Sequence, residues 1–249
     1  MALRANRIVY WISRHWLFLA NVAVAVFISL PFLAPVLMKH GHERAAGAIY
    51  TIYSPACHQL AFRSWFLFGE EPYYPLSVTN LDAHYFEEAV AGEPLFSGLS
   101  PDEGFGTYSW AARRYVGSEQ MGYKVALCQR DVAIYAGLLL GGLLFGLVRT
   151  HLKPLSWKVF LVAGVLPMMI DGGYQLIAHM APGLFGVHET LPTLRTLTGF
   201  LFGSGLMWLT YPHIQAGMKE MEEEIGAKLA AVDERKRAEV AERLTGLDR

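Results

Sequence analysis

Long apolar segments are the feature that most constrains this chain. Residues 16–38 contain no charged side chain, and residues 132–148 form a second apolar run that is rich in Gly and Leu. Two further apolar runs cover residues 159–178 and 196–211. A helix of about 20 mostly apolar residues crosses the ~30 Å hydrocarbon core of a bilayer. We therefore predict an all-α membrane protein with about four transmembrane helices, in contact with membrane lipid.

The composition agrees with this prediction and excludes some functions. Of the 249 residues, 53% are hydrophobic and 17% are charged, whereas about 25% of residues are charged in soluble domains. A net charge of −1 does not supply the basic surface that nucleic-acid binding needs. The chain also lacks Walker, nucleophile-elbow and H-E-x-x-H motifs. These absences favour a role other than enzyme.

Basic residues lie in the segments that we predict to share one side of the membrane. Three arginines stand in residues 1–15, three basic residues and no acid lie in the link 149–158, and more basic residues follow in 212–249. Basic flanks stay in the cytoplasm. We therefore predict a multi-pass plasma (inner) membrane protein with both termini cytoplasmic. The prolines inside the long first run favour an uncleaved span over a signal peptide.

The segment 39–131 lies outside in this topology and divides into two parts. Residues 45–68 are apolar but interrupted by Pro55 and Arg63, so we expect short interfacial helices there rather than a fifth span. Residues 70–122, the loop layer, are rich in tyrosine, glycine, acids and proline. Aromatic side chains supply large contact areas and dominate protein interfaces. We therefore expect an ordered layer that contacts a protein partner.

Residues 212–249 are predicted to form a charged cytoplasmic helix. Ile225, Leu229 and Val232 stand at helical spacing, but Lys236 interrupts the apolar seam. This pattern favours a solvated helix on the membrane surface or on a partner over a long coiled coil.

Two cysteines and two neighbouring polar residues form a first candidate site, the thiol group: Cys57, His58, Cys128 and Asp131. In the predicted topology all four lie at the outer membrane surface. Such donors can hold zinc or another transition metal. A Cys57–Cys128 disulfide is an alternative in an oxidising compartment. Two buried, unpaired thiols are a third interpretation.

A second candidate site, the polar group, lies within the membrane. Asp171, Gln175 and His179 recur every four residues and share one helix face. A central aspartate costs about 2.5–3.5 kcal/mol on insertion scales, so this face should point inward. Arg195 is the expected counter-charge of Asp171, and Thr198 follows Arg195 on the same face. The group is either an ion pair that fixes helix packing or a site or proton path.

Both groups map to the outer part of the molecule, whereas the cytoplasmic half of each span is almost purely apolar. A channel normally carries polar residues through both halves, so we do not expect a channel. The supporting polar residues at the same level are Gln59, Arg63, Arg130 and Tyr135.

Glycines in the second and fourth spans predict close helix contact. Gly137, Gly141 and Gly142 lie in the second span, and Gly199, Gly203 and Gly205 lie in the fourth. Small residues at four-residue spacing let helix backbones approach within lipid.

Four short motifs give the chain a family resemblance. They are Cys57-His58-Gln59 with Arg63-Ser64-Trp65-Phe66, Cys128-Gln129-Arg130 with Ile134-Tyr135-Ala136-Gly137, Asp171-Gly172-Gly173-Tyr174-Gln175, and Leu194-Arg195 with Thr198-Gly199. Together they resemble a family of small polytopic prokaryotic membrane proteins whose function is not known. The resemblance extends from Ala45 to Gly205 and implies no activity.

The resemblance also marks two departures from the family pattern. The second motif of that family reads C-x-R-C, which implies a Cys3His metal site, whereas Asp131 stands here in place of the last cysteine. The family joins its first two motifs by a short loop, so residues 70–122 resemble an insertion.

Three functions follow as hypotheses. The first is an accessory or structural subunit of a membrane complex that contacts a partner through the loop layer. The second is a membrane metal-binding or redox protein that uses the thiol group. The third is a small transporter or membrane enzyme with a pocket at Asp171, Gln175 and Arg195.

Overall fold

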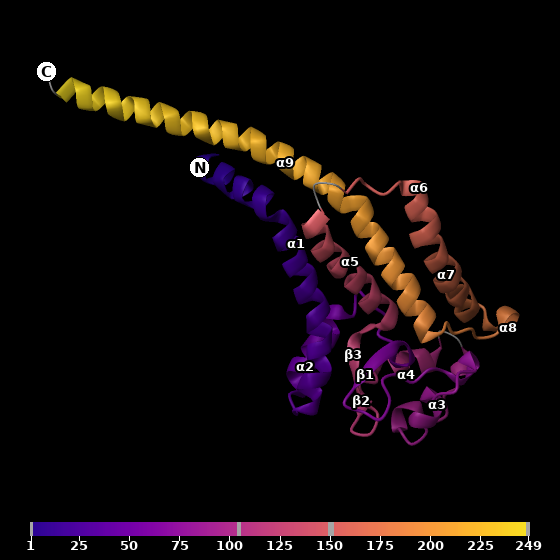
Figure 1. Ribbon diagram of the computed structural model, residues 1–249. Helices are drawn as coiled ribbons and strands as arrows, with labels where there is room; N and C mark the ends of the chain where they lie inside the picture. Colours follow the sequence, from indigo (N-terminus) through magenta and orange to yellow (C-terminus); the bar gives the residue numbers. More distant parts are fainter. Residues whose placement is uncertain (1, 104–105, 149–151, 248–249) are drawn as a thin grey trace.

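The computed structural model describes residues 2–103, 106–148 and 152–247. In chain order its elements are α1 (Ala2–Lys39), α2 (Glu43–Tyr53), η1 (Ala61–Arg63), β1 (Ser64–Leu67), η2 (Ser77–Thr79), α3 (Phe86–Ala89), η3 (Pro94–Phe96), η4 (Pro101–Glu103), α4 (Thr107–Arg114), β2 (Gly117–Ser118), β3 (Gly122–Cys128), α5 (Gln129–Val148), α6 (Trp157–Phe160), η5 (Leu161–Val165), α7 (Leu166–Met180), α8 (Pro182–Phe185) and α9 (Pro192–Leu247). Figure 1 shows long helices that form a bundle, with the strands and the short helices α3 and α4 gathered at one end of it, the sheet end.

Three helical stretches are long and apolar enough to cross a membrane: Leu3–Lys39, Gln129–Val148 and Trp157–Met180. The third consists of α6, η5 and α7, and η5 is a single π-helical segment within it. These stretches contain the first three predicted spans, so the prediction of a multi-pass helical protein is confirmed. Residues 196–211 are helical as part of α9 but are not among the three stretches, and the fourth span stays a prediction.

The helix α9 is longer than expected. The predicted fourth span and the predicted tail helix belong to one helix of 56 residues, which continues through Pro212. Its tail packs beside the first turns of α1 (Figure 1), where Trp16 Nε1 donates to Gln215 Oε1 at 3.1 Å and Arg14 pairs with Glu222 at 3.3 Å. At least part of the tail is therefore bound by its own chain.

Glycines bring the backbones of α5 and α9 together. A Cβ added at Gly203 would lie 2.0 Å from the backbone oxygen of Ile134, and one at Gly137 would lie 2.6 Å from that of Phe200. Atoms at such distances overlap, so only hydrogen fits at these positions. The predicted close approach of the second and fourth helical runs is confirmed.

The sheet corrects the all-α prediction. Strand β3 lies between β1 and β2, and both neighbours pair with it antiparallel. The register places Phe66 opposite Lys124 and Leu67 opposite Tyr123. β1 is only four residues long, too short to show a period of two. Its partner lies beyond the loop layer, so the pairing depends on contacts that no local pattern indicates.

The loop layer surrounds a hydrophobic core of its own. Phe86, Tyr108 and Tyr115 belong to a buried cluster together with Phe62 and Phe66 from the neighbouring η1 and β1. Their rings meet edge to face, for example Phe86 and Phe96 at 5.5 Å between centroids, a favourable arrangement of aromatic quadrupoles. Many of the aromatic residues that suggested a docking surface therefore stabilise the layer itself.

A fully buried lysine connects the sheet to the loop layer through hydrogen bonds. Lys124 of β3 has no exposed surface, and its Nζ donates to the backbone oxygens of Gln59, Ala112 and Arg113 at 2.8, 3.4 and 2.7 Å. Burial lowers the pKa of Lys124 to about 7, against 10.5 for an exposed lysine, because the charged form loses its hydration.

This lysine predicts a pH dependence of stability. Between about pH 7 and 10.5 the unfolded chain holds the Lys124 proton and the folded chain does not, so the contribution of Lys124 to folding stability increases as the pH rises through that range. We expect Lys124→Met to remove this slope. The measurement is the free energy of unfolding of both proteins in neutral detergent at several pH values. Equal slopes would contradict the prediction.

Candidate functional site

One pocket brings the two predicted groups together at the sheet end of the bundle. It has a volume of about 260 Å³, and all four members of the thiol group line it, with Gln175 and Arg195 of the polar group and with Arg63 and Arg130. These residues come from the segment after α2, from η1, from the junction of β3 and α5, and from α7 and α9. The fold therefore converges on this pocket from segments far apart in the sequence.

The turn after α2 and the end of β3 each direct one backbone N–H group toward Cys57. The Cys57 Sγ accepts hydrogen bonds from the backbone N–H groups of Gln59 at 3.3 Å and Cys128 at 3.2 Å. Gln59 adopts a left-handed φ of 53°, which is uncommon for a residue with a side chain. Its side-chain amide secures this turn, because Nε2 donates to Tyr50 O at 2.9 Å and to Ala126 O at 3.0 Å.

Three members of the thiol group lie close enough to share an ion. One donor atom each of Cys57, Cys128 and Asp131 lies within 4.8 Å of the other two, and the Cys128 thiol donates to Asp131 Oδ2 at 2.9 Å. Donors around a tetrahedral zinc lie roughly 3.3–3.8 Å apart, given bonds of about 2.0–2.3 Å. His58 is exposed and lies outside this close set, although it lines the same pocket.

Both cysteines are free thiols in this structure. The hydrogen bond with Cys128 raises the pKa of the Cys57 thiol, as do burial and the negative charges of Cys128 and Asp131. These neighbours therefore oppose the ionisation of Cys57, and a cation beside its sulfur would remove that opposition. The arrangement is compatible with a metal ion and, after a small movement, with a disulfide.

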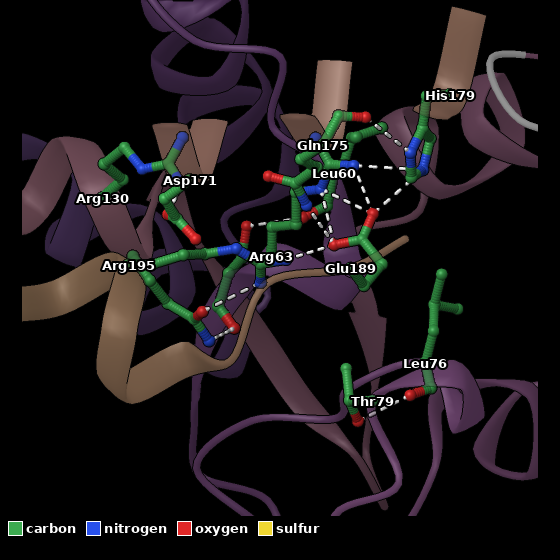
Figure 2. Close-up of polar contacts among 12 residues, drawn as sticks. Leu60, Arg63, Leu76, Thr79, Arg130, Asp171, Gln175, His179, Glu189 and Arg195 are labelled. Atoms are coloured by element: carbon green, nitrogen blue, oxygen red, sulfur yellow. Dashed lines mark hydrogen bonds and ion pairs between the residues drawn. The ribbon is translucent and has the colours of Figure 1, made fainter. Parts of the chain in front are cut away.

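A carboxylate that the sequence analysis did not identify lies at the centre of the polar contacts. Glu189, in the loop between α8 and α9, has a fully buried side chain that pairs with Arg63 and Arg195. Gln175 Nε2 donates to it at 2.5 Å, and His179 Nε2 lies 2.9 Å from Oε1. Figure 2 shows these side chains converging on the carboxylate.

The positive charges keep Glu189 ionised. Burial by itself raises the pKa of this carboxyl, but the charges of Arg63 and Arg195 and the hydrogen bond from His179 outweigh burial and lower the pKa to about 2. A signal was present in the sequence, since Glu189 is the only acidic residue between His179 and Arg195. How deeply Glu189 is buried, however, depends on how the loop between α8 and α9 folds back onto α7.

The predicted ion pair between Asp171 and Arg195 is wrong. Asp171 pairs with Arg130 at the start of α5, while Arg195 pairs with Glu189 and donates from Nη1 to Gln129 Oε1 at 3.3 Å. Helical spacing placed Asp171 on the correct face, but it could not say which of several arginines at that level lies nearest.

Two motif glycines make room for Arg130. A Cβ at Gly172 would lie 2.4 Å from Arg130 Nη1, and a Cβ at Gly199 would lie 2.6 Å from the Arg130 backbone oxygen. The D-G-G and T-G motifs therefore admit Arg130 between α7 and α9, which brings its guanidinium to Asp171.

Two predicted site residues have structural contacts instead. Thr198 is buried, and its hydroxyl donates to Leu194 O at 2.8 Å within α9. The Tyr135 ring packs against Phe27 of α1, with 4.6 Å between centroids. Neither residue is among those that line the pocket.

Comparison with known proteins confirms the family resemblance. Residues 120–209 match the family model described as "Predicted membrane protein (DUF2085)". The chain is also 23% identical over 199 residues to a protein of Methanocaldococcus jannaschii described as "Uncharacterized protein MJ1492", an alignment that covers 77% of this chain and 87% of that protein. No solved structure matches the chain significantly.

Proposed function

We propose that this membrane protein binds a transition-metal ion through Cys57, Cys128 and Asp131. The observation that supports the proposal is the approach of their donor atoms to within 4.8 Å of one another in the lining of one pocket. Thiolates favour zinc, copper(I) and iron, and one carboxylate among them is compatible with zinc.

The surroundings of Cys57 support a metal-bound thiolate. Two backbone N–H groups donate to its sulfur, and such donors outside the ligand set stabilise the negative charge of a ligand and fix its direction. The Gln59 side chain holds one of these donors in place through Tyr50 and Ala126.

Three protein ligands leave one tetrahedral position for water, a substrate or His58. Zinc sites with three protein ligands and one open position are typical of catalysis, whereas structural sites use four protein ligands. When bound, the ion would supply a Lewis acid at the pocket. His58 is exposed beside it, so we assign it to the edge of the site and not to the close ligand set.

Metal analysis of purified variants tests the proposal. We expect about one equivalent of metal in the natural protein, at least ~10-fold less retained by Cys57→Ser, and a smaller loss for His58→Ala. His84→Ala is the matched control, because His84 packs on the Tyr74 ring in the layer. Substoichiometric metal together with a Cys57–Cys128 disulfide in the natural protein would overturn the proposal.

The arrangement of the bundle supports the orientation that we propose, with the link before α6 in the cytoplasm and the pocket outside. Figure 1 shows the amino terminus, the link before α6 and the α9 tail on the side of the bundle away from the sheet. Lys153 and Lys158 lie in or next to this link, so basic flanks favour a cytoplasmic position for it and an outer position for the pocket. Labelling of single engineered cysteines in intact cells with an impermeant reagent tests this: a tail site should stay unlabelled and one at Ser97 should react.

An accessory role in a membrane complex is a second candidate. Val78 and Leu95 expose 42% and 41% of their surface on the layer, although most of its aromatic residues are internal. Crosslinking from these positions in native membranes should yield a specific partner if the role is correct, and no specific adduct if it is not.

A further inference from the structure

A second cavity adjoins the pocket and is largely apolar. This recess has a volume of about 360 Å³, and Trp110, Leu176 and Met180 contribute to its lining. His58 and Leu60 line both the recess and the pocket, so the two cavities are neighbours. A ligand that occupied both would have one apolar part and one polar part.

The recess borders the lipid-facing side of α7. Leu176 and Met180 belong to the apolar stretch Trp157–Met180 and expose 47% and 71% of their surface. Exposed apolar side chains on a membrane span contact acyl chains. A hydrocarbon chain can therefore pass from the bilayer into the recess that Trp110 helps to line.

Two guanidinium groups in the pocket lining hold unused donors. Among the residues that the structure describes, the buried Nε–H groups of Arg130 and Arg195 have no hydrogen-bond acceptor. Arg195 is 2% exposed, and its Nη1 and Nη2 already donate to Gln129 and Glu189. Buried donors without acceptors are unfavourable, and an anion that reached these two groups from the pocket would satisfy them.

We propose that the pocket binds the phosphate group of an amphipathic molecule whose hydrocarbon chain lies in the recess. Guanidinium groups match phosphate in charge and in the planar geometry of their donors. A phospholipid, an isoprenoid phosphate and free phosphate share this headgroup chemistry, and the recess selects the first two. The inference depends on Arg130, Arg195 and Trp110 and not on a metal ion.

Calorimetric titration of the purified protein in neutral detergent tests the proposal with three probes: dodecyl phosphate, inorganic phosphate and dodecanol. We expect dodecyl phosphate to bind at least about tenfold more tightly than either of the others, because only it fills both cavities. Equal binding of inorganic phosphate would overturn the assignment of the recess. Equal binding of dodecanol would overturn the phosphate site.

Variants separate the two parts of the site. Arg130→Lys keeps a charge for Asp171 but removes the Nε–H, so we expect at least about tenfold weaker binding of both phosphates. Trp110→Ala should weaken only dodecyl phosphate, and Trp157→Ala is its matched control, since the two tryptophans are 62% and 63% exposed. If Arg130→Lys alters folding, Arg195→Lys provides the same test. Unchanged affinities in the folded variants would overturn the proposal.

The same titration in a Cys57→Ser/Cys128→Ser variant distinguishes this inference from the metal proposal. We expect that variant to lose metal and to keep dodecyl phosphate binding. Loss of dodecyl phosphate binding there would overturn the independence of the phosphate site from the metal.

Discussion

Glu189→Ala is expected to destabilise the protein by about 3–5 kcal/mol, the usual cost of removing one partner from a buried ion pair. The substitution would leave Arg63 and Arg195 next to each other without a counter-charge, and both now pair with this one carboxylate. The measurement is the free energy of unfolding in neutral detergent at pH 7.

A matched control isolates burial as the cause. Glu224 also pairs with a base, Lys228 at 2.6 Å, but on the exposed tail of α9, and we expect no measurable change for Glu224→Ala because water screens such pairs. A loss for Glu189→Ala no larger than that of the control would show that the carboxylate does not hold the arginines.

The dependence of stability on acidic pH provides a second test of Glu189. The pKa of Glu189 is lowered from 4.5 to about 2, so its contribution to stability is complete above about pH 4.5 and is lost as the pH falls toward 2. Glu189→Gln cannot titrate at this position. We expect the natural protein to lose stability more steeply than this variant over that range, and parallel curves would contradict the assignment.

Gly203→Ala is expected to separate α5 from α9 and to cost about 1–3 kcal/mol, the usual effect of inserting one methyl group into a close contact. The new Cβ would lie 2.0 Å from the Ile134 backbone oxygen, and a backbone atom can move only if the whole helix moves. The same unfolding measurement applies, with metal content as a second readout because α5 also carries Asp131.

Gly217→Ala is the control on the same helix. No atom lies within 4 Å of a Cβ added at Gly217, and alanine is favoured over glycine in a helix by about 1 kcal/mol. We therefore expect this variant to be as stable as the natural protein or slightly more stable. A loss of stability equal to that of Gly203→Ala would mean that a general effect of the added methyl group, not the contact with α5, causes the change.

Local patterns were sufficient for the helical part of the fold. Runs of apolar residues identify membrane-spanning stretches because bilayer thickness sets their length. Helical spacing placed Asp171 and Gln175 on an inward face because an unpaired polar group is costly in hydrocarbon. The close approach of α5 and α9 at Gly203 followed from the absence of a side chain on glycine. Each inference needs only neighbours along one helix.

Contacts between distant segments decided the rest. Strand β1 pairs with β3 across the loop layer, and the aromatic residues of that layer could not be divided into core and surface without knowing its shape. Most of them proved internal, which removed the main argument for a docking surface.

The sequence by itself therefore determined the helical membrane class of the protein and the end of the helices at which the polar side chains gather. Only the tertiary structure decided the pairs: Arg130 with Asp171, and Arg63 and Arg195 with Glu189. The physical reason is that charges at one depth can pair in several ways with similar energy. The paths of the backbones and the space left by Gly172 and Gly199 select among those pairings.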